Sequence, residues 1–471
     1  MRRLKNILLI TLAILAVTRK TTAQEKTLSP QQVMEVVRQF HPVAKQASIV
    51  IDKAKADVTI ARGNFDPLLN NSIAQKTFDG TAYYQYKRPE LNIPTWFGIE
   101  LTAGLENLSG NRTDPTETLG KTSYMRISIP LAQNLLMDKR RAVLQTAKIL
   151  RQASETERKN ILNNLLLDAM KAYWYWVQYY QAYKVLTDAV LVNEKRLDLV
   201  KTGFRLGDRP AIDTVEALTQ LQSFSVQREN AYLQFQNAGL ELSVFLWNAD
   251  DKPVDLPVEV TPAEDALTLT RSPANLPVLN ELIDAARKNH PELILYNFKL
   301  DVLFVDRKLK FQQLLPVANF KYNHLNKGYD ILKSSLGPLF ENNFQYGLTL
   351  GIPLRLSEGR GEYRKAKLKI AETKLQQDLK ALQIENKIRS YFNEMTALKK
   401  QIEIQEKAYQ NYLALQRGEE IRFLAGESSL FLINARENKT LEALQKLQEL
   451  RTKYLVTANE LQWAAGVLTQ Q

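Results

Sequence analysis

Side chains that commonly perform covalent chemistry are scarce in this sequence. It has no cysteine, which excludes disulfides, thiolate metal sites and a cysteine nucleophile. Its three histidines, His41, His290 and His324, are widely separated along the chain, and the first two precede prolines in similar settings. We interpret these two as residues at breaks between helices. An enzyme that depends on histidine is therefore not expected.

The acidic residues offer little more for catalysis. Asp250 and Asp251 are adjacent, but they lie in a proline-rich stretch and are interpreted as solvated loop residues, so a carboxylate hydrolase has poor support. Asp213 and Glu216 are three residues apart at the start of a predicted helix and therefore share one face. Acidic residues are favoured in a first helical turn by the helix dipole alone. No G-x-x-x-x-G-K-[ST] nucleotide loop is present.

The amino terminus has the order of a secretory signal peptide. Basic residues come first, an apolar run follows from Ile7 to Val17, and small residues precede Gln24. We expect residues 1–23 to be removed, because the apolar run is too short to span a bilayer. The mature chain then has 58 basic and 51 acidic residues, a net charge of +7 that does not call for nucleic acid. Without cysteine it also has no site for a lipid anchor.

The prolines divide the mature chain into two similar parts. Residues 36–42, which end in His41-Pro42, are echoed by residues 285–291, and Ile129-Pro130-Leu131 is echoed by Ile352-Pro353-Leu354. We predict two internal repeats, 24–249 and 279–471, joined by an irregular linker at 250–278. The offset between the repeats falls from 249 to 223 residues, so the first repeat has about 26 extra residues. We expect an added hairpin or loop at about 70–93.

Each repeat has two long helical segments free of proline. Apolar residues with heptad spacing predict helices at about 138–203 and 211–247, and again at about 358–417 and 427–466. The first would extend roughly 95–100 Å at 1.5 Å per residue, so it needs an antiparallel partner to bury its apolar stripe. We interpret the aromatic residues Tyr173, Trp176 and Tyr180 as packing at this seam.

Ahead of each long helix the apolar period changes from about 3.6 to 2. The segments at about 95–131 and 317–354 alternate apolar and polar residues, which predicts four strands with one oily face. Such a sheet could belong to a soluble protein, but the signal peptide favours strands that cross an outer membrane. Four strands cannot close a barrel, and an open edge is unstable in lipid, so several chains must share one. Three chains would give twelve strands and two would give eight.

This duplicated layout resembles the TolC family of outer-membrane channels over essentially the whole mature chain. The local match is the turn after each long helix, where Gly207 precedes Ala217 and Gly426 precedes Ala435. The resemblance implies a mainly α chain with membrane β, in which a long antiparallel α-helical coiled-coil barrel, the tunnel, joins a 12-stranded trimeric transmembrane β-barrel. It places the protein in the outer membrane of a Gram-negative bacterium with the tunnel in the periplasm.

The resemblance also implies a function and partners. The chain would be a passive exit duct of a tripartite efflux or type I secretion system, energised by an inner-membrane pump of the RND, ABC or a similar class through a periplasmic adaptor. Its surroundings would be outer-membrane lipid and two further copies of itself, with no cofactor, metal or nucleic acid. The alternative is a soluble periplasmic coiled-coil adaptor or scaffold, which would explain the heptads but not the alternating strands.

Family members place the two turns at a periplasmic tip that docks on the adaptor. The candidate adaptor-contacting positions are Phe204, Arg205, Leu206, Gly207, Phe423, Leu424, Ala425 and Gly426. Acidic rings often line the closed entrance, and Asp213 and Glu216 are the candidates here. The matching positions of the second repeat are Phe431 and Asn434, so the acidic ring usual there is missing and cation selectivity is left open.

Overall fold

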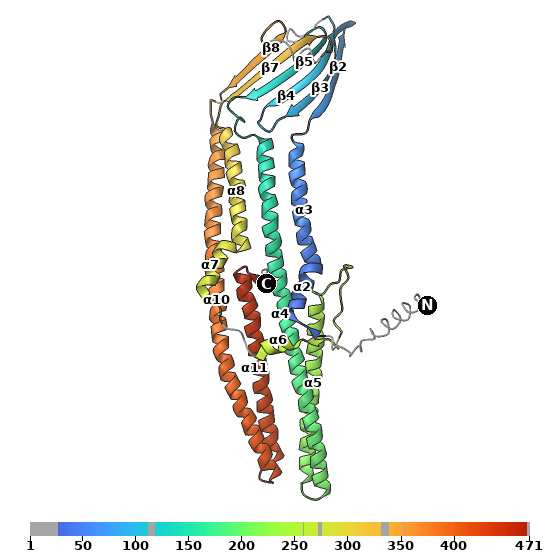
Figure 1. The fold of residues 1–471 in the computed structure, drawn as a ribbon, viewed down its shortest axis with the longest axis vertical. Coiled ribbons are helices and arrows are strands. Elements are labelled where there is room, and N and C mark those ends of the chain that lie inside the picture. The colour runs from blue at the N-terminus through green and yellow to red at the C-terminus, as the bar shows by residue number, and fades with distance from the viewer. Residues whose placement is uncertain are drawn as a thin grey trace, which may run out of the picture. The chain divides into compact units, whose positions relative to one another are not determined.

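The computed structural model describes residues 27–111, 118–257, 259–271, 276–330, 339–352 and 354–468 (Figure 1). The expected signal peptide, Pro273 of the linker and Pro353 of the repeated motif lie outside these residues. The chain divides into two units, which we call the helical unit (Met1–Lys45, Asn163–Leu282 and Lys387–Gln471) and the sheet unit (Gln46–Leu162 and Ile283–Asn386). Among the described residues, no helix combines the length and the apolar character needed to cross a membrane.

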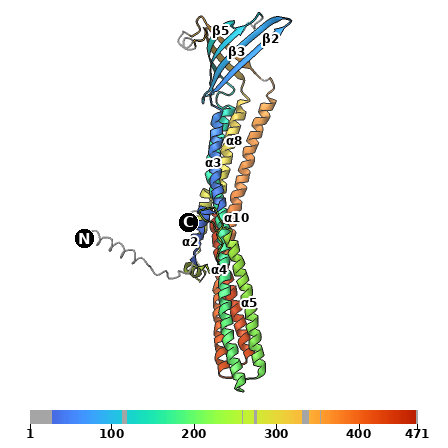
Figure 2. The same ribbon diagram turned by 90° about the vertical axis from the view of Figure 1, so that its right-hand side faces the viewer.

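Two very long helices, α4 (Lys139–Arg205) and α10 (Ser357–Leu424), run from one unit into the other along the chain. In the helical unit each is followed by a return helix, α5 (Ala211–Ser243) after α4 and α11 (Leu430–Ala464) after α10, which lies alongside it (Figures 1 and 2). Compared with the sequence expectation, α10 extends seven residues further than 417, and α5 ends four residues before 247. The heptad stripes thus form two antiparallel helical hairpins.

Apolar and aromatic side chains fill the seams between these helices. Leu186 and Val190 of α4 form a buried cluster with Phe224 of α5 and Leu441 of α11. Further along α4, Tyr173 and Trp176 are at most 1% exposed, and the Trp176 ring stacks on Phe235 with 6.0 Å between centroids. These aromatic residues are therefore packing residues of the coiled coil, as their heptad positions indicate.

Both histidine–proline pairs lie between two helices. His41 separates α2 (Pro30–Phe40) from α3 (Pro42–Gly63), and His290 separates α7 (Leu279–Asn289) from α8 (Pro291–Gln312). In each case imidazole Nδ1 accepts a hydrogen bond from a backbone N–H of the following helix, that of Val43 at 3.2 Å or that of Glu292 at 3.3 Å. The histidines therefore cap helices that begin at proline, which confirms their interpretation as helix-break residues.

The linker and chain ends in the helical unit contain shorter elements. Strand β1 (Thr27–Leu28) pairs in parallel with β6 (Thr261–Pro262), and α6 (Glu264–Arg271) follows. The hydroxyl of Tyr173 donates a 2.9 Å hydrogen bond to the Leu28 carbonyl. This bond attaches the first described strand to α4.

The described residues of the sheet unit include one antiparallel sheet of six strands. They are β2 (Leu68–Phe78), β3 (Thr81–Pro94), β4 (Glu100–Ser109), β5 (Gly120–Pro130), β7 (Val317–Lys327) and β8 (Phe344–Gly351), side by side in that order (Figure 1). The expectation of four strands is wrong, because the extra residues of the first repeat form a β2–β3 hairpin within the sheet. A hairpin or loop was expected at about 70–93, but its two strands alternate poorly and carry Pro89, so their place in the sheet was not predicted from period 2.

The register gives the sheet one apolar and one polar face. Leu101 lies opposite Ile127 and Ala103 opposite Met125, so the apolar residues of β4 and β5 share a face as their alternation predicted. The apolar face contains Ile93, Leu101, Ala103, Met125, Ile127, Ile129, Phe320, Tyr322, Leu348 and Leu350. The polar face contains Arg88, Glu90, Asn92, Thr102, Glu106, Tyr124, Arg126, Asn323 and Gln345.

A turn, not a strand, occupies the start of the segment expected at 95–131. The Thr95 N–H donates to the Ile99 carbonyl at 2.9 Å, and Gly98 has a φ of +84° that other residues rarely adopt. Trp96 leaves the sheet to stack on Phe65, with ring centroids 4.6 Å apart. Strand β4 therefore begins at Glu100, five residues later than expected.

Candidate functional site at the two helical turns

The turns that end α4 and α10 have the same backbone structure. In the first, the N–H of Gly207 donates to the Phe204 carbonyl at 3.1 Å and that of Asp208 to the Gly203 carbonyl at 2.9 Å. In the second, Gly426 and the residue after it make the matching bonds, at 3.1 and 2.9 Å. This pair of bonds is the Schellman motif, and it requires a left-handed residue. Glycine supplies it in both turns, with φ of +83° and +78°.

Seven of the eight predicted tip positions are exposed on the described chain. Leu424 is 81% exposed, Leu206 73% and Phe204 46%, and the exposed set also includes Arg205, Gly207, Ala425 and Gly426. Phe423 differs, because it is only 8% exposed. The guanidinium carbon of Arg209 lies 3.9 Å from the centre of the Phe423 ring. Phe423 thus joins one turn to the other by a cation–π contact.

Beneath the turns an apolar cluster joins the two helical hairpins. It combines residues of α4, α5, α10 and α11, namely Leu197, Val200, Ala217, Phe423, Leu430 and Ile433. Because all four helices contribute, neither hairpin can move without uncovering apolar surface. The exposed turn residues therefore project from a packed base.

The four predicted gate residues have different surroundings. Glu216 accepts a 3.3 Å hydrogen bond from the side-chain amide of Asn434, which is 7% exposed, so these two positions are brought together across the hairpins. Asp213 instead forms an ion pair with Arg209 at 3.4 Å, within its own hairpin. Phe431 is 67% exposed. Both carboxylates are thus engaged by neighbouring side chains.

A buried polar network beside this base was not predicted from the sequence. Arg196 of α4 forms an ion pair with Glu437 of α11 at 2.6 Å, and their side chains are only 11% and 8% exposed. The Asn193 amide donates to the same carboxylate at 3.2 Å, and Glu420 of α10 lies 3.9 Å from the guanidinium. Asn193 is buried between Val190 and Leu197 on α4, so a polar residue three positions after one apolar seam residue and four before the next was the available signal.

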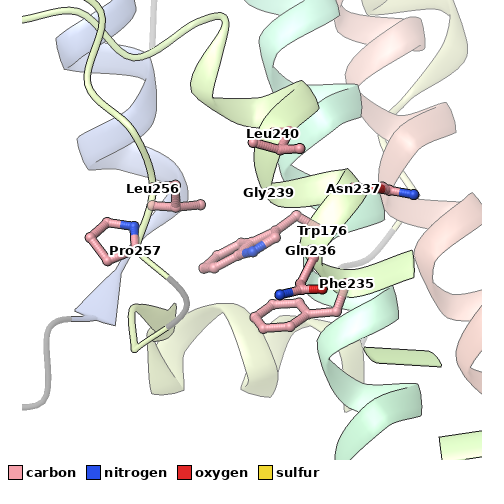
Figure 3. A pocket seen from close by; sticks show the side chains of 8 residues that line it. All are labelled: Trp176, Phe235, Gln236, Asn237, Gly239, Leu240, Leu256 and Pro257. Carbon is pink, nitrogen blue, oxygen red and sulfur yellow. The ribbon is translucent and has the colours of Figure 1, made fainter. Parts of the chain in front are cut away.

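A shallow hollow of about 260 Å³ lies further along the helical unit, between α5 and the linker. Figure 3 shows the Trp176 indole facing it, with Leu256 and Pro257 of the linker on one side and Phe235 of α5 on the other. Gly239 lies beside the indole, and an added Cβ there would be in ordinary van der Waals contact with it, 3.7 Å from the nearest atom. The hollow marks where the linker packs on the coiled coil. Among the described residues no group of three or more His, Cys, Asp or Glu could hold a metal ion.

Comparison with known proteins identifies the fold. No protein-family model and no curated protein sequence matches the chain. Among solved structures, the Campylobacter jejuni CmeC outer membrane channel matches 93% of this chain and 86% of its own, at 15% identity and a TM-score of 0.64. The open state of the Neisseria gonorrhoeae MtrE outer membrane channel matches 93% and 89%, at 13% identity and a TM-score of 0.63. The Vibrio cholerae outer membrane protein VceC matches 93% and 96%, at 14% identity and a TM-score of 0.62.

Proposed function

We propose that this chain, which has the fold of the TolC-type outer-membrane channels, is a subunit of an outer-membrane exit duct. The observation that carries the proposal is the two-faced antiparallel sheet, in a chain otherwise built from long coiled-coil helices. Solved channels of the same fold support it. The duct would be passive and would serve a tripartite efflux or type I secretion system.

The apolar face of the sheet suits contact with lipid. Strand β8 exposes Leu348 and Leu350 at 52% and 70%, which would be unfavourable in water over a whole face. Near one end of the sheet, the rings of Tyr322, Phe340 and Phe344 pack together, with centroids 4.7 and 5.6 Å apart along the series. Aromatic residues gather at the interfaces of membrane barrels in this manner.

Closing the sheet needs further copies of the chain. An unpaired strand edge is not tolerated in lipid, and one sheet of six strands leaves two edges. We therefore propose a homotrimer that shares one barrel, with the polar face lining a water-filled pore. The matching Schellman turns and histidine caps support the two proposed internal repeats.

The exposed turn residues would meet a periplasmic adaptor. Leu206, Leu424 and Phe204 offer exposed apolar surface on a packed base. The sequence has no nucleotide-binding loop, so energy would come from an inner-membrane pump bound through the adaptor. Asp213, Glu216, Phe431 and Asn434 would lie near the entrance. Opening would then require the links between the two helical hairpins to break.

Planar-bilayer recording with the purified full chain tests the duct. A trimer in detergent with stable single-channel conductance is expected. A monomer that stays soluble without detergent and gives no conductance would refute the proposal and favour the soluble adaptor or scaffold.

Site-specific photo-cross-linking tests the tip. A photoreactive residue at Arg205 or at Leu424 should trap a periplasmic adaptor in cells, whereas the same residue at buried Phe423 should not. Failure at both exposed positions would contradict the tip assignment even if the protein conducts.

A further inference from the structure

We infer that the β2–β3 hairpin is part of the barrel wall, and that β2 of one copy pairs with β8 of the next. Each chain would then contribute six strands, and a trimer eighteen, in place of the twelve expected from the sequence. This inference rests on the proposed function, because only several copies could close the sheet. It concerns how the copies join.

The hairpin is continuous with the rest of the sheet. Strand β3 pairs with β4 from Gln85 opposite Ser109 to Pro94 opposite Glu100, along nearly the whole of β4. Only the positions around Pro89 interrupt the ladder, as expected where a residue lacks an N–H. The edge of β4 is therefore already occupied within the chain.

Side chains on the polar face fasten the hairpin to its neighbours. Arg88 forms an ion pair with Glu106 of β4 at 2.6 Å, and the Thr102 hydroxyl of β4 donates to the Asn92 side chain at 2.7 Å. These contacts are on strands that also share a backbone ladder. Separating β3 from β4 would break both sets of bonds.

One further contact reaches across an entire strand. The hydroxyl of Tyr124, in β5, donates a 2.8 Å hydrogen bond to Glu90, in β3. Its ring crosses β4 at Gly104, where an added Cβ would lie only 2.5 Å from the ring carbon that bears the hydroxyl. Glycine at this position therefore leaves the space for the crossing. The hairpin is held by β5 as well as by β4.

The two remaining edges suit each other in direction and in face. Every step across the sheet is antiparallel and five steps separate β2 from β8, so these strands run in opposite directions. The face that is apolar on β4 and β5 continues onto β2, where Leu69 lies opposite Leu91 and Ile73 opposite Lys87, with Asn71 between them. On β8 it includes Leu348 and Leu350. An antiparallel β2–β8 pair would join apolar face to apolar face between copies.

The inference changes the size and lining of the pore. At the same strand tilt, barrel diameter grows about linearly with strand number, so eighteen strands would make a barrel roughly 1.5 times as wide as twelve. Its cross-section would be roughly twice as large. The hairpin also adds Arg88 and Glu90 to the polar face, beside Glu106 and Arg126. The wall would carry both signs of charge.

Cysteine cross-linking tests the edge directly, because the natural chain contains no cysteine. Ser72→Cys of β2 would be combined, in three full-length variants, with Gln345→Cys, Gly347→Cys or Thr349→Cys of β8. All four positions lie on the polar face, and the three partners sample neighbouring registers. As a matched alternative, Thr102→Cys of β4 would be combined with the same three. Outer membranes would be oxidised and run on denaturing gels without reductant.

With Ser72→Cys, at least one partner should shift the band from monomer to covalent dimer and trimer, reversibly with reductant. The Thr102→Cys variants should stay monomeric. Cross-links from Thr102→Cys instead would overturn the inference and indicate four strands per chain, while the proposed channel would stand. If neither series gave a cross-link, the inference would also be overturned. Single-channel recording of the same preparations would then show whether the proposed channel function fails as well.

Discussion

The buried ion pair between Arg196 and Glu437 gives the sharpest prediction for the helical unit. The change is Arg196→Met, which keeps an unbranched apolar stem and removes the charged guanidinium. Glu437, 8% exposed, then loses a partner at 2.6 Å and keeps only the Asn193 amide at 3.2 Å. A carboxylate left buried in this way is strongly unfavourable.

The size of the effect follows from that loss. Removing one partner of a buried pair typically destabilises by 3–5 kcal/mol, and the remaining amide contact favours the lower figure, about 3 kcal/mol. Each 1.36 kcal/mol is a factor of ten, so the opening equilibrium of the helical hairpins should shift about 100-fold. Replacing both residues with methionine should be within about 1 kcal/mol of the natural chain, because no charge is then left buried.

Hydrogen exchange of the purified full chain in detergent measures this opening locally. Backbone amides of α5 and α11 near Arg196 should exchange about 100-fold faster in Arg196→Met than in the natural chain. The double variant Arg196→Met/Glu437→Met should recover most of the protection. Lys439→Met is a matched control, because Lys439 pairs with Glu442 on the surface of α11, the helix that holds Glu437. This substitution should leave the exchange rates unchanged.

Two results would refute this reasoning. If Arg196→Met left exchange unchanged, the pair would not hold the hairpins together. If the double variant exchanged as fast as the single one, the loss would come from packing and not from an unpaired charge.

Three further predictions concern other positions. Gly104→Ala should displace the Tyr124 ring and lower the free energy of unfolding by about 1–3 kcal/mol. Thermal or denaturant unfolding in detergent measures this change. An unchanged free energy of unfolding would mean that the ring has no fixed place over residue 104. Gly207→Ala should lower the free energy of unfolding by about 1–2 kcal/mol, because the backbone φ at this position is +83°. Gly418→Ala, inside α10 with open space around it, should instead raise the free energy of unfolding. Equal effects in the same unfolding measurement would exclude backbone strain at Gly207 as the cause. Burial lowers the pKa of His41 below 6.5, so protonation penalises the folded state and the free energy of unfolding should fall as pH drops below 6.5. His41→Asn should reduce this dependence on pH in unfolding curves. An unchanged pH dependence would mean that other groups cause it.

Periodic patterns predicted the elements whose own residues repeat regularly. Heptad spacing predicted the long helices, because a coiled-coil seam requires an apolar residue at every third or fourth position along a single segment. Alternation placed Leu101 and Ile127 on one face for the same reason. At the turns, Gly207 and Gly426 marked the left-handed positions, which few other residues can take.

Features that depend on distant residues were missed. The β2–β3 hairpin was expected only as an added hairpin or loop, and its place in the sheet was missed. Its run Lys87, Arg88, Pro89 and Glu90 looks like a loop until Glu106 and other partners on neighbouring strands are known. Phe423 is likewise buried by side chains of other helices, and Arg209 of the other hairpin lies over its ring.

The position of the added hairpin has a consequence for how such a protein could diversify. A two-stranded insertion returns the chain to the end of the sheet from which it left, so α3 still leads into the sheet and α4 still leads out of it. Gain or loss of one hairpin could therefore change the diameter of the barrel without changing how the helices connect to the sheet. On this view, barrel width would vary in increments of two strands per subunit, independently of the turns proposed to meet an adaptor.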